Sequence, residues 1–191
     1  MKVGLFFGSF NPVHIGHMII ADYMVEFTGL EQVWMVVSPH NPLKPKQTLA
    51  PDYDRLHLVR LAIGDHPKLR ASDIEFYLDK PSYTVDTLAY LREKYPDKEF
   101  ALIMGGDNLM SLPKWKNYEF LLANYPIYVY RRPRYEDETL AQHPNVRVFD
   151  APLLDISASF VRECRKTGKS IRYLLPESVY QYLETSHLYR K

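Results

Sequence analysis

A short apolar run at the start of the chain leads directly into a glycine-bearing turn and then into a helical pattern. Val3 to Phe7 is typical of a buried β-strand, Gly8 opens the turn, and apolar residues recur every four positions from Ile15 to Phe27. Unpaired backbone N–H groups and the positive end of the helix dipole face the turn at such a junction. The sequence therefore predicts an anion site here, and phosphate is the anion that this chemistry favours.

Two histidines, His14 and His17, stand at the start of the expected helix. Because residues three apart lie on one face of a helix, we expect both imidazoles to point at the same bound group. A zinc pair is one alternative, but no Cys or acidic residue with ligand spacing lies nearby in the sequence. Incidental histidines at a helix start are the other alternative.

Further apolar runs alternate with helical patterns along the chain. The expected strands after the first are 33–37, a weaker extended segment over 69–78, 100–104, 127–130 and 146–149; the expected helices are 15–27, 51–63, 84–95, 157–167 and 176–185. This alternation predicts an α/β fold with a Rossmann-like open, mostly parallel sheet and helices on both faces. We expect a single domain over residues 1–191, with the helices from about residue 157 packed on it.

Charge and composition limit the partners of the chain. Its net charge is +1, so no global field favours nucleic acid or an anionic membrane. The single cysteine, Cys164, excludes an internal disulfide framework. The first strand begins at the N-terminus without a signal peptide, and no apolar run reaches membrane-spanning length. We expect a cytoplasmic protein that binds neither nucleic acid nor membrane.

A serine-rich helix start, Ile156 to Arg162, is the second candidate for phosphate binding. Asp155 or Ser157 can cap this helix, and the hydroxyl of Ser159 lies within its first turn. Arg162 follows one turn later and can place a planar cation beside phosphate oxygens, although an Arg there is also an ordinary surface residue.

Two further segments point to an organic ligand. Pro81 to Leu88 predicts a helix N-terminus with Thr84 as N-cap, and its exposed N–H groups suit a small carboxylate. In the segment after the expected strand 100–104, Asp107 can accept from ribose hydroxyls, and Trp115 offers a face to an aromatic ring or packs in the core. Because ligands of parallel sheets collect at the carboxyl ends of strands, we expect one composite site.

The motifs carry a family resemblance. Gly8 to His17 resembles the nucleotidyltransferase signature GxFxPxHxGH, and Ile156 to Arg162 resembles the ISSTxxR signature of the same superfamily, with Ala158 and Ser159 where Ser and Thr are usual. With the segments YTVDT and GDNLMSLPKW, the chain resembles the bacterial nicotinate mononucleotide adenylyltransferase family from Lys2 to the 182–189 region.

That resemblance implies adenylyl transfer from ATP to nicotinate mononucleotide in NAD biosynthesis, with deamido-NAD and pyrophosphate as products and Mg²⁺ arriving with ATP. It implies no metal-ligating residues. The implied catalytic residues are His14, His17 and Arg162; the ATP-binding residues are Gly8, Ser9, Phe10, Asn11, Gly16, Ile156, Ser157 and Ser159; the mononucleotide-binding residues are Lys44, Tyr83, Thr84, Gly106, Asp107 and Trp115. The loop that holds His40 and Lys44 departs in spacing from the commonest family form, so the roles of these two residues stay open.

Several other functions compete with this interpretation. A nicotinamide mononucleotide or phosphopantetheine adenylyltransferase, or a cytidylyltransferase, shares the 14–17 motif; the last two do not account for Thr84 and the 107–115 segment. A noncatalytic nucleotide-binding module would not need His14, His17 and Arg162 together. A class I aminoacyl-tRNA synthetase would carry a KMSKS-like segment and an anticodon domain. The sequence leaves open the turnover, the formation of a homo-oligomer and the strictness of the preference for nicotinate.

Overall fold

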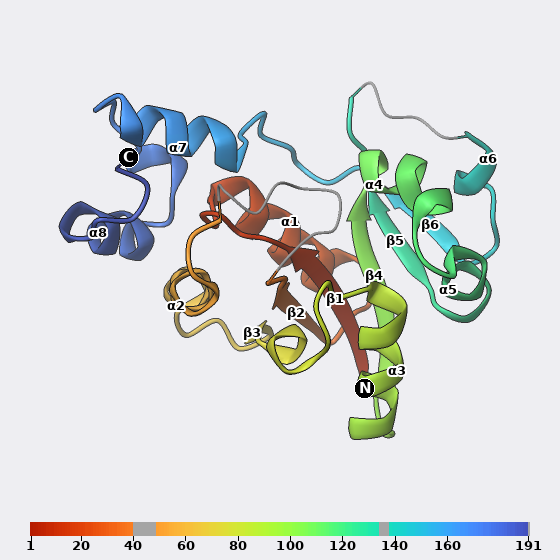
Figure 1. Cartoon of the computed structure of the whole chain (residues 1–191). Helices are drawn as coiled ribbons and strands as arrows, with labels where there is room; N and C mark the ends of the chain where they lie inside the picture. Colours follow the sequence, from red (N-terminus) through yellow and green to blue (C-terminus); the bar gives the residue numbers. More distant parts are fainter. Residues whose placement is uncertain (40–48, 134–137, 191) are drawn as a thin grey trace.

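The chain is built around a parallel β-sheet. The computed structural model describes residues 1–39, 49–133 and 138–190. Its six-stranded sheet has the order β3-β2-β1-β4-β5-β6, and every neighbouring pair is parallel (Figure 1). The strands are β1 (Lys2–Gly8), β2 (Gln32–Val37), β3 (Leu69–Ser72), β4 (Glu99–Gly105), β5 (Ile127–Tyr130) and β6 (Val146–Phe149). The predicted open parallel sheet is confirmed.

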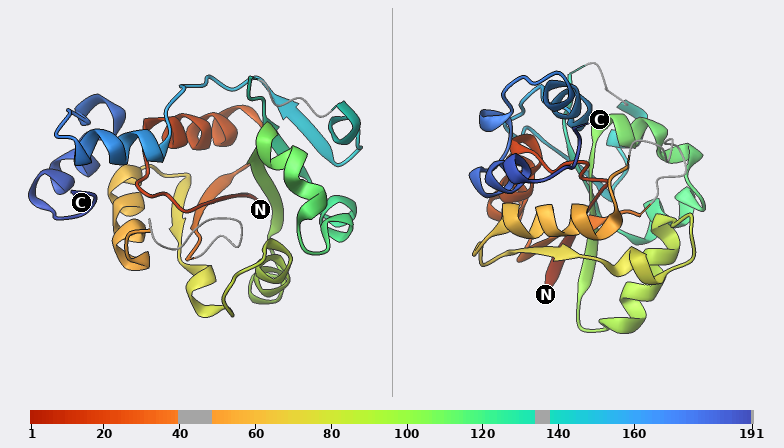
Figure 2. Two further views of the ribbon diagram at one scale, coloured as in Figure 1. Left: turned by 45° about the horizontal axis from the view of Figure 1, so that its top comes forward. Right: turned by 60° about the vertical axis from the view of Figure 1, so that its left-hand side comes forward.

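Helices join the strands and lie on both faces of the sheet (Figure 2). They are α1 (Ile15–Phe27), α2 (Asp52–Ile63), α3 (Thr84–Lys94), α4 (Gly106–Ser111), α5 (Tyr118–Asn124), α6 (Glu138–Ala141), α7 (Ala158–Lys166) and α8 (Glu177–Thr185). Short 3₁₀ turns are η2 (Ile74–Tyr77), η3 (Leu112–Lys114) and η4 (Arg172–Leu174). Each of the five helices expected from the sequence is present, with its ends within one residue of those expected.

Two hydrophobic clusters lie on the two faces of the sheet. Alternate residues of β1 point to opposite faces, so Phe6 belongs to one cluster and Leu5 to the other. The first cluster is completed by α1, α2, α7 and α8, with Met24, Val59, Val161 and Val179 as buried members. The second is completed by α3, α4 and α5, with Leu88, Leu109 and Leu121 as buried members.

The buried face of α1 differs from the one that the four-residue repeat predicts. Ala21 and Met24 are fully buried, whereas Phe27, a member of the repeat, is 71% exposed. In a helix with 3.6 residues per turn, positions four apart drift by about 40° per step, so the repeat turns away from the sheet. The expected helix is confirmed, and residues outside the four-residue repeat form most of its inner face.

Two other expectations need correction. The segment 69–78 was expected to be extended, but the strand ends at Ser72 and η2 follows it. The strands and helices expected from the sequence leave 131–144 without an element, but its described residues contain the short helix α6. The helices α4 and α5 have no counterpart among the expected elements, because each is seven residues or shorter and gives little periodicity.

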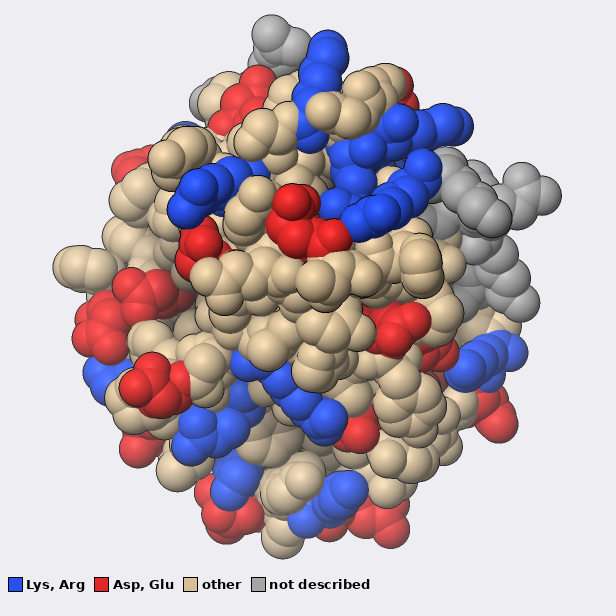
Figure 3. Space-filling view, turned by 90° about the vertical axis from the view of Figure 1, so that its left-hand side faces the viewer, with Lys and Arg blue, Asp and Glu red and all other residues tan. Residues whose placement is uncertain are grey.

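The C-terminal helices are fastened to α2 and to one another. The hydroxyl of Ser178 in α8 donates to the carbonyl of Leu61 in α2 over 2.7 Å. The guanidinium of Arg165 in α7 donates to the carbonyls of Leu183, Ser186 and Leu188. Figure 3 views the molecule from the side on which Figure 1 places α2 and α8, and side chains of both charges are spread over this face. No helix in the described ranges is long and apolar enough to cross a membrane.

Candidate active site

The strand order marks a place for a ligand between the ends of β1 and β4, each of which is a glycine. The chain runs outward from β1 to β3 on one side and then returns to β4 on the other side of β1, so the order reverses between β1 and β4. Ligands of open parallel sheets bind outside the carboxyl ends of the strands at this reversal. Gly8 ends β1 and Gly105 ends β4. A Cβ atom would lie 2.9 Å from the Phe10 ring at Gly8 and 2.5 Å from Asp107 Oδ1 at Gly105, so a side chain at either position would displace a neighbour.

The turn after β1 is packed tightly and leads into the N-terminus of α1. Phe10 is 1% exposed and has a φ of +44°, in the region that favours glycine. The buried Asn11 accepts the Ala50 amide on its side-chain oxygen over 3.1 Å. The first helical amides that reach the His14 carbonyl come from His17 and Met18. The amides of Ile15 and Gly16 therefore have no acceptor within the helix, and they form the positive end of α1.

The two histidines lie together at this helix end. Their rings stack with centroids 3.7 Å apart and planes inclined by 25°, so the two imidazoles lie side by side, and a common bound group for them stays a prediction. The His14 amide donates to Nδ1 of His17 over 3.2 Å, which assigns the proton of a neutral His17 ring to Nε2. His14 is 5% exposed, and its Nδ1 is buried without a hydrogen-bond partner among the described residues.

Burial sets the protonation state of His14. Desolvation, the larger cause, and the positive charge of Arg132 together lower its pKa to about 4. The imidazole is therefore neutral at physiological pH and can act there as a hydrogen-bonding group without a charge.

The start of α7 lies against the start of α1. Ser157 caps α7 by accepting the Phe160 amide on Oγ over 3.1 Å, as one of the two predicted caps. Arg162 donates from Nη1 to the Asn11 carbonyl over 2.8 Å and from Nη2 to Ser159 Oγ over 3.2 Å. The segment that precedes α7 passes above α1 in Figure 1.

Contacts within that segment complete this side of the site. The Leu154 carbonyl would be 4.0 Å from a Cβ at Gly16, and the half-buried Ile156 packs on the cluster that contains Phe10. The predicted ATP-binding segments from the two ends of the chain are therefore brought together.

The N-terminus of α3 forms a second part of the site. Its N-cap is Tyr83, and Thr84 is the first helical residue, so the expected N-cap at Thr84 is wrong by one position. Asp86 and Thr87 donate their amides to the Tyr83 carbonyl, which leaves the amides of Thr84 and Val85 without an acceptor in the helix.

The segment that holds Trp115 lies beside this helix start. Lys116 Nζ is 2.8 Å from Asp86 Oδ2 and 4.9 Å from the centroid of the Tyr83 ring. Trp115 itself is half-buried and packs on the same cluster as Tyr83. The structure therefore brings together the two predicted mononucleotide-binding segments, and it gives Trp115 a packing role as well.

Asp107 stands directly after β4, at the second position of α4. One of its oxygens, Oδ2, is 3.5 Å from Arg132 Nη1, and the other, Oδ1, is buried without a hydrogen-bond partner among the described residues. Gly106 before it is buried. Burial raises the pKa of the neighbouring Tyr130 to about 12, so its hydroxyl stays protonated. Buried polar atoms of His14 and Asp107, on both sides of the strand-order reversal, thus have no partner in the part of the chain that the structure describes.

Sequence reasoning missed two arginines that shape the site. Arg55 is fully buried and donates to the carbonyls of Ser9 and Ser38 over 2.5 and 2.9 Å. In the sequence it is one charged residue of a helix that also carries Asp52, a pattern typical of a solvated helix face. Arg132 lies in the stretch 131–144, for which the sequence predicts no strand or helix. His40 and Lys44 lie outside the residues that the structure describes.

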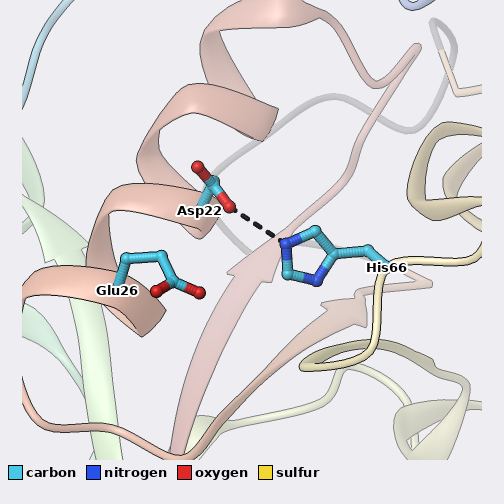
Figure 4. Close-up of side chains that lie close together, drawn as sticks. All are labelled: Asp22, Glu26 and His66. Carbon is cyan, nitrogen blue, oxygen red and sulfur yellow. Dashed lines mark hydrogen bonds and ion pairs between the residues drawn. The ribbon is translucent and has the colours of Figure 1, made fainter.

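A group with metal-ligand chemistry lies elsewhere. Asp22 and Glu26 on α1 and His66 before β3 have ligand atoms within 4.8 Å of one another (Figure 4). His66 Nε2 is 3.0 Å from Asp22, and Glu26 is 2.8 Å from Lys68 Nζ, so both carboxylates already have partners. Because His66 precedes β3, the group lies at the amino ends of the strands, away from the candidate site.

Comparison with known proteins shows the family of the chain. The model of the family described as Cytidylyltransferase-like matches residues 5–164. A protein of Flavobacterium psychrophilum named "Probable nicotinate-nucleotide adenylyltransferase" is 55% identical over the full length of both chains. A protein of Bacteroides fragilis with the same name is 48% identical over 94% of this chain and 90% of its own length.

Solved structures show the same fold at lower identity. The Plasmodium falciparum nicotinic acid mononucleotide adenylyltransferase complexed with NaAD has a TM-score of 0.83 and 19% identity, over 98% of this chain and 97% of its own. The structure of that enzyme complexed with APC has the same TM-score and identity and covers 98% and 96%. At this identity the likeness establishes the fold.

Proposed function

Since the chain belongs to the nicotinate-nucleotide adenylyltransferases of the cytidylyltransferase-like family, we propose that it transfers an adenylyl group from ATP to nicotinate mononucleotide. The products are deamido-NAD and pyrophosphate. The observation that carries this proposal is the contact of Arg162 with Asn11, which joins the N-termini of α1 and α7 at the carboxyl end of β1. Two helix N-termini and a guanidinium at one point suit a polyphosphate.

ATP binds between α1 and α7 in this proposal. Gly8, Ser9, Phe10 and Asn11 form the turn under the phosphates, and Gly16 lets the chain approach them closely. Ile156, Ser157 and Ser159 line the opposite wall. The catalytic groups are His14, His17 and Arg162, which stabilise the charge on the phosphates.

The mononucleotide binds between α3 and α4. The amides of Thr84 and Val85 face the nicotinate carboxylate beside Tyr83, and the Trp115 ring stacks on the pyridine. Asp107 accepts from the ribose hydroxyls on the Oδ1 atom that has no partner among the described residues, and Gly106 lets the ribose approach. Lys44 remains a candidate for the phosphate of this substrate, outside the described residues.

Chemistry proceeds without a protein nucleophile. An oxygen of the mononucleotide 5′-phosphate attacks the α-phosphorus of ATP, and the bond between that phosphorus and the oxygen bridging to the β-phosphate breaks as pyrophosphate leaves. Negative charge grows on the leaving group. His17, Arg162 and the amides of Ile15 and Gly16 supply donors that are fixed before the reaction, which is the usual basis of catalysis in phosphoryl transfer.

Mg²⁺ bound to ATP would neutralise part of the triphosphate charge. Among the described residues, Asp107 is the carboxylate that directly follows a strand bordering the reversal, and its Oδ2 is engaged by Arg132. Mg²⁺ is normally held by one or two carboxylates together with substrate phosphates, and the carboxylate of Asp107 is already paired with an arginine. Phosphate oxygens of ATP would therefore supply most of the ligands of the ion.

We also propose that residues 1–191 act as one unit in the cytoplasm. Packing of α7 and α8 on the first hydrophobic cluster supports the unit. The buried free thiol of Cys164 needs no oxidising compartment, which supports the location.

Pyrophosphate release from ATP tests the function. The purified chain is given ATP and Mg²⁺ with nicotinate mononucleotide, nicotinamide mononucleotide or phosphopantetheine in parallel. We expect the highest kcat/KM with nicotinate mononucleotide and deamido-NAD as the product. Faster turnover of phosphopantetheine, or ATP binding without pyrophosphate release, would replace this function with one of its competitors.

A further inference from the structure

A buried carboxylate outside the assigned substrate residues joins the segments around the site. Glu75 belongs to η2, between β3 and α3, and is 2% exposed. A lone ionised carboxylate at this depth would lose much of its solvation energy, so it needs hydrogen-bond donors. The residues that donate to it show which segments Glu75 joins.

Within the described part of the chain, the side chains that donate to Glu75 are hydroxyls next to the site. Ser82 Oγ donates to Oε2 over 3.1 Å, and Thr87 Oγ1 donates to Oε1 over 2.8 Å. The Ser38 hydroxyl, directly after β2, bonds to the same carboxylate. Burial raises the pKa of Glu75 above its ordinary value, and these three hydrogen bonds oppose part of that rise. Ser82 and Thr87 bracket Thr84, so Glu75 fixes the beginning of α3 from both sides.

Ser38 also links this carboxylate to a buried guanidinium. Its hydroxyl bonds to Glu75, while its carbonyl accepts from Arg55 Nη1 over 2.9 Å. The same Nη1 atom donates to the carbonyl of Ser9 in the turn after β1. A continuous chain of hydrogen bonds therefore runs from the turn of the ATP site through Arg55, Ser38 and Glu75 to the start of α3.

The contacts of Glu75 go to the ends of elements and not to the packed core. A buried charge that merely filled space could be replaced by an apolar residue at little cost. Here the carboxylate accepts from three hydroxyls in two segments, and one of those segments presents the amides of Thr84 and Val85, which have no acceptor within the helix. The orientation of these amides depends on where α3 begins.

We propose that Glu75 is a positioning residue for the mononucleotide, acting through Ser82 and Thr87 on the amides at the start of α3. This inference rests on the proposed function. It assigns part of the preference for nicotinate mononucleotide (the acid) over nicotinamide mononucleotide (the amide) to a side chain that touches neither substrate. We call this the acid-over-amide preference.

Glu75→Gln tests the inference, because it preserves the shape of the side chain but replaces one acceptor oxygen with an NH₂ group. We expect the KM for nicotinate mononucleotide to rise about five- to tenfold while the KM for ATP stays within twofold. In the same variant, the ratio of kcat/KM for the acid to kcat/KM for the amide should fall. Glu93→Gln on the exposed side of α3 is the matched control and should leave all three quantities unchanged.

Ser82→Ala removes one of the three donors and keeps the test decisive if Glu75→Gln fails to fold. We expect the same direction with a smaller effect. Circular dichroism and thermal melting establish that each variant is folded. A folded Glu75→Gln or Ser82→Ala with unchanged mononucleotide KM and unchanged acid-over-amide ratio would overturn the inference.

An equal rise in the KM values of both substrates would also overturn it, since that is what general loosening of the fold produces. The proposed function fails separately. In that case the unmutated protein would release no pyrophosphate with either mononucleotide, and the positioning role would fall with it.

Discussion

The guanidinium of Arg162 donates to the backbone carbonyl of Asn11 over 2.8 Å, although 151 residues separate the two in sequence. The same side chain donates to Ser159 Oγ. Protein contacts thus fix its plane beside the N-terminus of α1. A guanidinium has five N–H donors, so it can serve these two acceptors and still offer donors to phosphate oxygens.

Arg162→Lys is expected to weaken ATP binding selectively. An ammonium is a point charge and cannot reproduce the planar fork that contacts Asn11 and Ser159 at once. We expect the KM for ATP to rise about tenfold or more, in line with the cost of a lost charge-assisted hydrogen bond, with little change for the mononucleotide. Steady-state kinetics with each substrate varied in turn measure the change in KM for ATP and for the mononucleotide separately. Arg172→Lys, at an exposed position in η4, is the control.

If Arg162→Lys changed only the mononucleotide KM, the assignment of α7 to ATP would be wrong.

His17→Ala should remove catalysis and leave the fold intact. The ring is partly exposed, stacks on His14 and stands at the positive end of α1. Loss of one fixed donor to the charge of a transition state typically costs ~10²–10³ in rate. We expect a fall of that size in kcat with a nearly unchanged melting temperature. His187→Ala, at an exposed position, serves as control, and near-normal turnover of His17→Ala would remove the residue from the catalytic groups.

Burial of His14 should make the stability of the chain depend on pH. Its folded-state pKa of about 4 lies below the ordinary value of 6.5, so the unfolded chain binds the proton more readily between these values. Stability is therefore lost as the pH falls below 6.5, by about 2 kcal/mol between pH 7 and pH 5 from this group. Urea unfolding of the unmutated chain and of His14→Gln at both pH values isolates the effect.

The difference in stability between these two proteins should shrink by that amount at pH 5. The same difference at both pH values would show that His14 titrates normally in the folded chain.

Periodicity predicted the long helices and the buried strands because those signals are local. The runs 33–37 and 100–104 are continuous and apolar, as strands covered on both faces must be, and both became central strands. The inner face of α1 was not predictable from the four-residue repeat, because the sheet decides which row of side chains is buried.

The site was predictable only in part for a related reason. The motifs from Gly8 to His17 and from Ile156 to Arg162 each announce an anion site, and the structure brings them together. Arg55 and Glu75 carry no such signal. Their importance comes from contacts with residues far away in sequence, such as that of Arg55 with Ser9, and a single sequence does not contain those pairings.

Gly105→Ala should destabilise the chain and disturb Asp107. The added Cβ would lie 2.5 Å from Asp107 Oδ1 and 2.9 Å from the Tyr130 ring, so one of these groups must move. Overpacking of this kind costs about 1–3 kcal/mol. We expect a lower melting temperature and a higher KM for the mononucleotide. Adding Asp107→Ala should recover part of the stability but none of the binding, whereas strictly additive effects on stability would show that the two positions do not clash.

The start of α3 should set the preference for the acid over the amide. Nicotinate mononucleotide carries a ring carboxylate, which accepts from the amides of Thr84 and Val85, whereas the amide analogue turns an NH₂ group toward them or leaves them mispaired. Each mispaired buried donor costs ~1–3 kcal/mol, so we expect kcat/KM to favour the acid by roughly tenfold to a hundredfold. Competition of the two mononucleotides for limiting enzyme, read as product ratios, measures this preference.

Trp115 contributes differently, because its face stacks equally well on both pyridine rings. Trp115→Ala should therefore weaken both mononucleotides alike and leave the acid-over-amide ratio unchanged. Thr84→Pro keeps a favourable helix-start conformation but removes one of the two amide donors, so it should narrow the ratio. Lys116→Ala, which breaks the ion pair with Asp86 but removes no amide, is the control for local disturbance of the helix start. Equal kcat/KM values for the two mononucleotides in the unmutated protein would show that the α3 amides do not read the carboxylate.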